Sequence, residues 1–229
     1  IESIRLSTRP DTITPDILAV LKQYGVSTIE LGAQSMDDDV LSRSGRGHTS
    51  ADTRKACKLL QAQGFTLGLQ LMPGLPGDTS ETFRETVSQI IALRPDFVRI
   101  YPALVIKETP LAELYRAGRY SPLSLDDAVL MCHQAVERFE LADIEVVRIG
   151  LQPTAELERP GTIIAGPWHP AFRQLVESSR FLEKVCSLLS AGDQAGTVTL
   201  VVNPADLSAV IGQRRRNIDA IKVRYGRDV

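Results

Sequence analysis

The spacing of the predicted strands constrains the fold of this 229-residue chain more than any other feature. Strands are predicted to start near residues 3, 27, 66 and 97, so 24, 39 and 31 residues separate successive starts. Helical patterns fill the intervals, and one of them opens at Thr14-Pro15 and closes at Gly25. This is the length of a βαβ unit, which predicts a parallel sheet with right-handed crossovers. The predicted fold class is therefore α/β, as part of a β/α barrel or as a doubly wound sheet.

The rest of the chain is less regular and predicts three segments. Residues 1–150 contain the β/α units, residues 151–196 a Pro- and Gly-rich loop and a connecting helix, and residues 197–229 a small basic module. In the first segment a helix is predicted from Ser124 to Leu141 and a strand from Glu145 to Ile149. The last segment is predicted to hold a strand at 197–202 and helices at 205–210 and 217–224.

The composition excludes several classes of protein. With 26 Lys and Arg against 28 Asp and Glu, the formal charge is -2, so the chain as a whole is no polybasic nucleic-acid or membrane binder. It has no run of 18 uncharged apolar residues, which predicts no membrane partner. Its cysteines, Cys57, Cys132 and Cys186, lack the spacing of a metal or disulfide set. We therefore expect a cytoplasmic protein with no metal ligands in this chain.

Polar residues occur at the C-terminal end of each early predicted strand. They are Ser7 after the first strand, Gln34 after the second, Gln70 near the end of the third and Tyr101 after the fourth. One such residue alone is as well explained by a satisfied polar group at a strand end. Because the C-terminal ends of parallel strands meet at one edge of a sheet, four together predict a ligand pocket there.

A basic loop lies between the second and third predicted strands. In Gly45-Arg46-Gly47, flanking glycines allow close backbone approach, and the guanidinium suits a carboxylate or phosphate. A solvated turn is the alternative. The histidines are scattered and form no metal set with a cysteine. No serine lies on a nucleophile-elbow sequence, so the sequence identifies no catalytic residue.

The C-terminal segment has a charge of its own. From residue 204 onward six basic residues face three acidic ones, a balance of +3. The order helix, VIGQRRRNI, helix resembles a KH module, in which a GxxG loop between two helices binds a nucleic-acid backbone. The second glycine is missing. Arg214, Arg215 and Arg216 are the nucleic-acid candidates, and a solvated basic helix end is the alternative.

Four phrases, read in order over residues 3–120, resemble the radical S-adenosylmethionine (SAM) superfamily. They are STRPD, ELGAQSMDDDVLSRSGRGHT, LMPGLPGDT and RIYPALVIKETPLAELYRAGRY. They are most similar to the Elongator catalytic-subunit branch, and the middle two also resemble oxygen-independent coproporphyrinogen III oxidase. The resemblance implies part of a (β/α)6 barrel. It also implies a 4Fe-4S cluster that cleaves SAM to a 5′-deoxyadenosyl radical.

The resemblance also implies roles for individual residues. The cofactor-binding positions fall on Ser7, Gln34, Arg46, Gln70 and the backbone near Leu104. Arg46 is expected to pair with the methionine carboxylate of SAM, and Gln34 and Ser7 to bond its ribose or carboxylate. On the substrate side the candidates are Arg9, Tyr101 and Lys107.

The chain has no CxxxCxxC motif, which holds the cluster in this superfamily. We therefore expect it to be an inactive C-terminal portion of an Elongator-like enzyme acting on tRNA, with the cluster ligands elsewhere in the parent protein. We also expect self-association through an exposed sheet edge at residues 3–7. The alternatives are a coproporphyrinogen III oxidase-type oxidoreductase and a nonenzymatic RNA-binding module on a barrel remnant.

Overall fold

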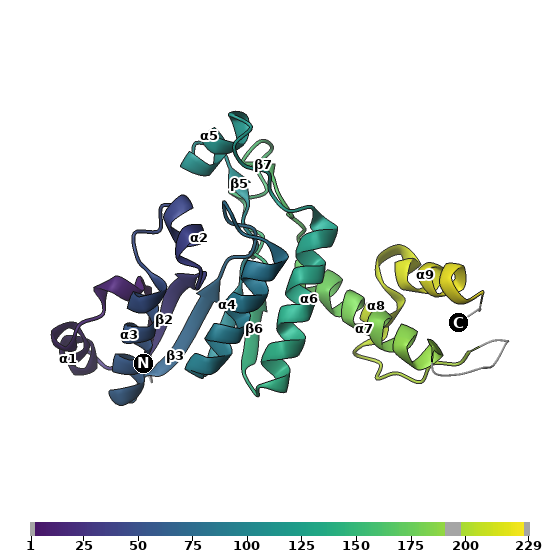
Figure 1. Cartoon of the computed structure of the whole chain (residues 1–229). Coiled ribbons are helices and arrows are strands. Elements are labelled where there is room, and N and C mark those ends of the chain that lie inside the picture. Colours follow the sequence, from purple (N-terminus) through teal and green to yellow (C-terminus); the bar gives the residue numbers. More distant parts are fainter. Residues whose placement is uncertain (1–2, 191–197, 227–229) are drawn as a thin grey trace. The chain divides into compact units, whose positions relative to one another are not determined.

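Parallel strands in the order β1-β2-β3-β4-β6 form the central sheet of the computed structural model, which describes residues 3–190 and 198–226 (Figure 1). The antiparallel pair β5-β7 forms a separate small sheet. The strands are β1 (Ile4–Thr8), β2 (Val26–Gln34), β3 (Thr66–Leu71), β4 (Phe97–Ile100), β5 (Val105–Ile106), β6 (Glu145–Ile149) and β7 (Ile163–Ala165). The parallel sheet that the strand spacing predicted is therefore confirmed.

Helices follow the strands of the central sheet, and most of them begin at a side-chain cap. Thr14, Asp37, Thr49, Thr79, Thr109 and Ser124 each accept a hydrogen bond from a backbone N–H in the first turn. The α-helices are α1 (Pro15–Gln23), α2 (Asp38–Arg43), α3 (Ser50–Ala62), α4 (Ser80–Leu93), α5 (Pro110–Arg116), α6 (Leu125–Leu141), α7 (Phe172–Ser190), α8 (Leu207–Ile211) and α9 (Arg216–Tyr225). Short 3-10 turns cover η1 (Pro10–Thr12) and η2 (Gln213–Arg215).

The two faces of the central sheet differ in composition. Helices α3, α4 and α6 run along one face (Figure 1), as right-handed crossovers between successive neighbouring strands require. On that face Ile29, Leu31, Leu69 and Ile100 are fully buried. The opposite face carries more polar side chains, among them buried Glu30, which pairs with Arg5 of β1 and Arg99 of β4. This face is therefore more polar than those of a sheet packed on both sides, although Phe97 is buried on it.

The chain divides into two compact units, residues 1–170 (unit 1) and 171–229 (unit 2). The described part of unit 2 is helical, and its core is built on α7 and α9 by Val185, Leu189 and Ile221. A turn between α8 and α9 carries the exposed arginines 214–216.

The strand predicted at residues 197–202 is wrong for 198–202, which form no regular structure; residue 197 lies outside the described residues. Val198 and Leu200 pack against the core of unit 2, whereas Val201 is 96% exposed. The alternation that suggested a strand is therefore present, but the described residues supply no strand to pair with it. The KH-like arrangement stays a prediction.

Three further details differ from the sequence analysis. Strand β7 lies inside the predicted loop 152–170 and pairs with β5, a partner far away in sequence. Helices α2 and α5 were not predicted. The sequence suggests Ser50 and Asp78 as the caps of α3 and α4, whereas the caps are Thr49 and Thr79, whose hydroxyls reach the free N–H groups of the first turn.

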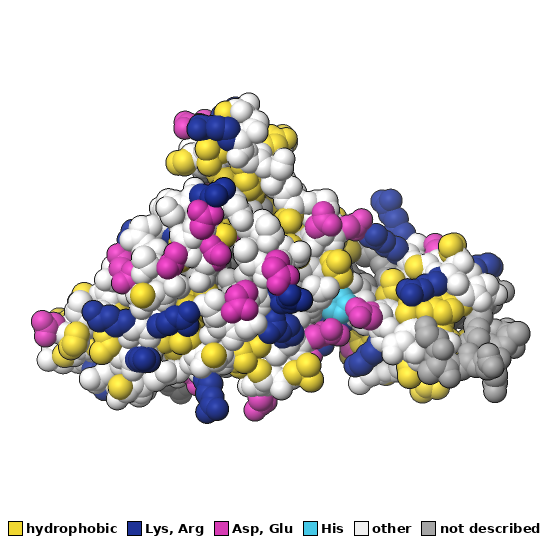
Figure 2. All heavy atoms as spheres, viewed as in Figure 1, with side chains coloured by type: hydrophobic (Ala, Val, Ile, Leu, Met, Phe, Trp, Pro, Cys, Tyr) yellow, Lys and Arg dark blue, Asp and Glu magenta, His cyan; other side chains and the backbone are white. Residues whose placement is uncertain are grey.

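The surface carries both signs of charge. In Figure 2, basic and acidic side chains are interspersed over the visible face of unit 1, in keeping with the net charge of -2. Within the described residues, no helix is long and apolar enough to cross a membrane.

Candidate functional site

A cavity of about 560 Å³ lies at the C-terminal ends of β1, β2 and β3. This volume is within the ordinary range of small-molecule sites. The cavity brings together Ser7, Gln34, Arg46 and Gln70, four of the five predicted cofactor positions. Its lining is Ser7, Thr8, Arg9, Gly32, Gln34, Ser44, Gly45, Arg46, His48 and Gln70.

Gln34 enters the cavity from an irregular end of β2. The register of β2 against β3 shifts between Leu31 and Gln34, and Gln34 itself adopts a left-handed backbone with φ 66°. Its amide nitrogen would lie 2.6 Å from a Cβ at position 32, so a larger residue there would require the Gln34 side chain to move. The amide oxygen Oε1 is buried and has no hydrogen-bond partner in the described chain.

Arg46 is held by the loop between α2 and α3. Its backbone N–H donates to Leu41, and its Nη2 lies 3.0 Å from the Met72 sulfur, a weak acceptor. No carboxylate of the described residues lies within ion-pair distance of the guanidinium, and its buried Nε has no partner. Burial lowers the pKa of Arg46 because desolvation disfavours the charged form. A half-buried cation without an anion is typical of a site for an anionic group.

His48 was not among the predicted site residues, yet it lines the same cavity. It is 7% exposed, and its Nε2 lies 3.1 Å from the backbone oxygen of Ala33. Its Nδ1 is buried without a partner in the described chain. The signal in the sequence was its position two residues after Arg46, in the loop that the sequence analysis singled out for a ligand.

The cavity is therefore lined by residues whose buried polar atoms have no hydrogen-bond partner in the described chain. Oε1 of Gln34, Nε of Arg46 and Nδ1 of His48 come from three residues that line one space. Unpaired buried polar atoms are uncommon in folded proteins, since each costs free energy. A ligand with acceptors and donors of its own would satisfy them.

Arg9 lies at the rim of this cavity but is already engaged. Its guanidinium bonds Asp11 through Nε and Nη2, at 2.9 and 2.7 Å, and donates to the backbone oxygen of Gly47 at 3.1 Å. The hydrogen bond from Arg9 lowers the pKa of Asp11. The arginine thus connects β1 to the loop that carries Arg46.

The remaining predicted residues lie outside the cavity lining. Tyr101 is half-buried, and its hydroxyl lies 3.2 Å from Nη1 of Arg99. Leu104 is 9% exposed and lies against Gly166. Lys107 is exposed and forms an ion pair with Glu108 at 3.0 Å. Their predicted roles in binding stay predictions.

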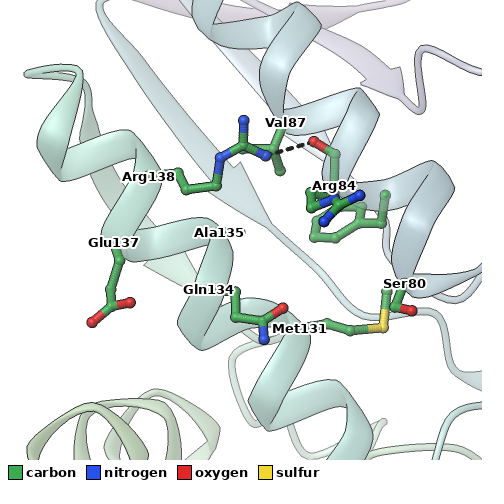
Figure 3. Close-up of a pocket in the computed structure, with 9 residues that line it drawn as sticks. Ser80, Arg84, Val87, Met131, Gln134, Ala135, Glu137 and Arg138 are labelled. Carbon is green, nitrogen blue, oxygen red and sulfur yellow. Dashed lines mark hydrogen bonds between the residues drawn. The ribbon is translucent and has the colours of Figure 1, made fainter. Parts of the chain in front are cut away.

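A second hollow in unit 1, of about 320 Å³, lies between α4 and α6 (Figure 3). Figure 3 shows Arg138 reaching from α6 to α4, where it donates to the backbone oxygen of Arg84 at 2.7 Å. Its Nη2 also donates to Ser88 at 2.8 Å. Among the described residues, none that lines this groove has a buried polar atom without a partner. The groove therefore lacks the unmet hydrogen bonding of the strand-end cavity.

The described residues do not supply a metal centre. No group of three or more His, Cys, Asp or Glu side chains within 3–190 and 198–226 could hold an ion. The three cysteines are all buried. Burial raises the pKa of Cys57 to about 12 and also raises that of Cys132, so both thiols stay protonated at neutral pH in the absence of a metal. These residues do not fit an iron–sulfur cluster.

Two family models match this chain in succession. The radical SAM superfamily model matches residues 1–90, and the radical SAM C-terminal domain model matches residues 95–181. The chain belongs to the radical SAM superfamily. The chemistry of this superfamily requires SAM and a 4Fe-4S cluster. The motif CxxxCxxC, which holds the cluster, is absent from this sequence.

Curated relatives of this chain include a tRNA uridine(34) acetyltransferase and Elongator complex protein 3. The chain is 35% identical over 127 residues to the tRNA uridine(34) acetyltransferase of Methanocaldococcus jannaschii. This match covers 54% of this chain and 24% of the relative. The chain is 36% identical over 129 residues to human Elongator complex protein 3, covering 55% of this chain and 24% of that protein. The matches therefore span about a quarter of each relative's length.

Solved structures agree with this placement. The archaeal Elp3 of Methanocaldococcus infernus superposes with a TM-score of 0.69 and 28% identity, over 80% of this chain and 42% of the other. Coproporphyrinogen III oxidase (HemN) from Escherichia coli superposes with a TM-score of 0.51 and 19% identity, over 61% of this chain and 32% of the other. At that identity HemN shows a shared fold alone.

Proposed function

We propose that unit 1 forms part of the SAM-binding site of an Elongator-like radical SAM enzyme that modifies tRNA. The observation that carries the proposal is the strand-end cavity, where Gln34, Arg46 and His48 leave buried polar atoms unpaired. SAM has a carboxylate, an ammonium group and ribose hydroxyls that complement this mixture of donors and acceptors. When bound, SAM supplies the adenosyl group that this superfamily uses for radical chemistry.

The proposed roles follow from the chemistry of each side chain. Arg46 binds the methionine carboxylate, because a guanidinium with no anion of its own gains a charged hydrogen bond there. Gln34 accepts from the ammonium group or a ribose hydroxyl through its free Oε1. Ser7 and Gln70 bond the ribose, and the backbone near Leu104 meets the adenine. No step is assigned to the cluster, since the described residues do not fit it.

A titration of the 229-residue chain with S-adenosylhomocysteine tests the proposal. This probe retains the carboxylate, ammonium and ribose of SAM and is chemically stable. Arg46→Met is expected to weaken binding about 10- to 100-fold, the worth of a charged hydrogen bond. Arg138→Met, in the groove between α4 and α6, is the matched control and should leave the affinity unchanged. No binding by the wild type, or equal affinities of all three proteins, would contradict the assignment.

The proposed substrate is a tRNA, and this rests on the relatives. One of them is named a tRNA uridine(34) acetyltransferase, and the chain covers only 24% of its length. A tRNA-modifying role implies a cytoplasmic location. Arg9, Tyr101 and Lys107 remain the candidates for the substrate side, with Arg9 at the rim of the cavity.

The basic turn of unit 2 is a second candidate site, for RNA. Arg214 and Arg215 are exposed, and both have left-handed backbones, with φ 51° and 63°. Arg215 lies where the KH pattern has its second glycine. Gly212 is at the first glycine position, and a Cβ there would meet Asn217 at 3.0 Å. A strained arginine at the glycine position, next to a second strained arginine, favours a role for their charge.

A gel-shift titration with bulk tRNA tests this second site. If the turn binds phosphates, Arg214→Glu with Arg215→Glu should abolish most of the affinity of the wild type. The logarithm of the wild-type affinity should fall with that of salt, by a slope of roughly -0.7 per phosphate contacted on a single strand. Arg84→Glu with Arg94→Glu makes the same charge change on α4 and at its C-cap, and serves as the control. Equal binding by both double variants would contradict a specific role for the turn.

A further inference from the structure

A buried carboxylate lies directly beneath the strand-end cavity. Glu30, in the middle of β2, is 1% exposed, on the face of the sheet away from the helices. Its partners come from three other strands: Arg5 on β1, Gln70 on β3 and Arg99 on β4. Of these partners only Gln70 also lines the cavity. Glu30 was not identified from the sequence.

The two carboxylate oxygens of Glu30 are used differently. Oε2 pairs with Nη2 of Arg5 and lies 3.3 Å from Nε of Arg99. Oε1 accepts a hydrogen bond from the amide nitrogen of Gln70. One oxygen therefore faces two cations, and the other holds a neutral amide.

This division fixes the orientation of the Gln70 amide. An ionised carboxylate only accepts hydrogen bonds, so the Gln70 amide must turn its NH2 group toward Glu30. Its carbonyl oxygen has no hydrogen-bond partner in the described chain and is the end left for the cavity. At this point the wall of the cavity is a hydrogen-bond acceptor, which suits a ligand group that donates.

We propose that Glu30 is a positioning residue that makes Gln70 an acceptor for a ribose hydroxyl of a nucleoside ligand. The inference rests on the proposed function, because it assumes that a nucleoside occupies the cavity. It adds the residue that determines whether Gln70 accepts a hydrogen bond from the ribose or donates one to it. Glu30 acts through Gln70 and does not touch the ligand.

The variant Glu30→Gln distinguishes this role from a purely structural one. Its amide oxygen is held by Arg5 and Arg99, since an NH2 group there would face two cations. Its NH2 group then takes the place of Oε1 and can only donate to Gln70. The Gln70 amide has to turn over, so that it presents a donor to the cavity. The shape of the site is kept while its polarity is reversed.

Three nucleosides serve as probes of this polarity: adenosine, 2′-deoxy-2′-fluoroadenosine and 3′-deoxy-3′-fluoroadenosine. Fluorine occupies the position of a hydroxyl but cannot donate. The wild-type chain is expected to bind adenosine about three- to tenfold more tightly than one of the fluoro compounds, as the loss of one neutral hydrogen bond predicts. In Glu30→Gln this ratio should fall to about one. The exchange variant Glu30→Gln with Gln70→Glu restores an acceptor and should restore the preference.

The outcomes separate the two hypotheses. If the wild-type chain binds none of the three nucleosides, the proposed function fails and the inference with it. If adenosine binds but Glu30→Gln keeps the wild-type ratio with an unchanged circular-dichroism spectrum, the inference alone is overturned. Should Glu30→Gln not fold, hydrogen exchange on the wild type decides. The Gln70 side-chain proton that faces Glu30 is expected to be protected, and free exchange of both amide protons would overturn the inference.

Discussion

Two hollows of unit 1 differ in whether the polar side chains that line them have hydrogen-bond partners. In the groove between α4 and α6, Arg138 donates to Arg84 and Ser88, so the groove is closed by its own hydrogen bonds. In the strand-end cavity, Gln34, Arg46 and His48 leave buried atoms unpaired. Helix packing accounts for the satisfied groove, whereas the proposed ligand accounts for the unpaired atoms at the strand-end cavity. Unmet hydrogen bonding therefore distinguishes the two better than their shapes do.

The largest stability effect is expected in the groove. Arg138→Met removes two charged hydrogen bonds between α6 and α4, at 2.7 and 2.8 Å, and should destabilise the chain by about 1–2 kcal/mol, discounted for partial exposure. Urea unfolding at neutral pH measures the loss. Gln134→Met, on the same helix and lining the same groove, is the control and should change little. If Arg138→Met left the free energy of unfolding unchanged, the hydrogen bonds of Arg138 would not stabilise the groove, and the contrast with the cavity would fail.

A smaller effect of opposite sign is expected in the cavity. Arg46→Met replaces a half-buried cation that has no carboxylate partner among the described residues, so the ligand-free chain should gain about 1 kcal/mol. The same urea unfolding measures the gain. Saturating S-adenosylhomocysteine should then favour the wild type, because a ligand stabilises the state that binds it. Destabilisation of the ligand-free Arg46→Met variant would show that Arg46 has a structural partner after all.

The sequence predicted the frame of this site because the frame depends on local signals. Strand spacing predicted the parallel sheet, and polar residues at strand ends predicted a pocket that Ser7, Gln34 and Gln70 line but Tyr101 does not. Arg46 lines the same pocket and was predicted from its glycine-flanked loop and from the family resemblance. Glu30 was not predicted because its partners come from three other strands. A charged residue between the apolar residues Ile29 and Leu31 did indicate a buried counter-ion, but not which residue supplies it. The pairing of β7 with β5 is also non-local. The strand prediction was wrong for 198–202, where half-buried and exposed residues alternate as in a strand but no partner strand is described.

The smallest effect concerns the start of α3, directly after the loop that carries Arg46, where Asp52 belongs to the capping box. Its carboxylate accepts from the backbone N–H and hydroxyl of Thr49, at 2.8 and 2.7 Å, and the Thr49 hydroxyl bond lowers its pKa. A lowered pKa in the folded state means that the stabilisation is present above the unfolded pKa, about 3.9, and is lost as the pH falls through the folded value. Asp52→Ala should therefore cost about 0.5–1 kcal/mol at pH 7, and this cost should shrink towards pH 3. The cap of α5 is Thr109, whose hydroxyl bonds the backbone of Ile106 and Ala112 and no carboxylate, so the cost of Thr109→Ala should stay constant over the same range. Urea unfolding of both variants at pH 7 and pH 3 measures the difference. If both costs varied alike with pH, the capping carboxylate of Asp52 would not be the titrating group.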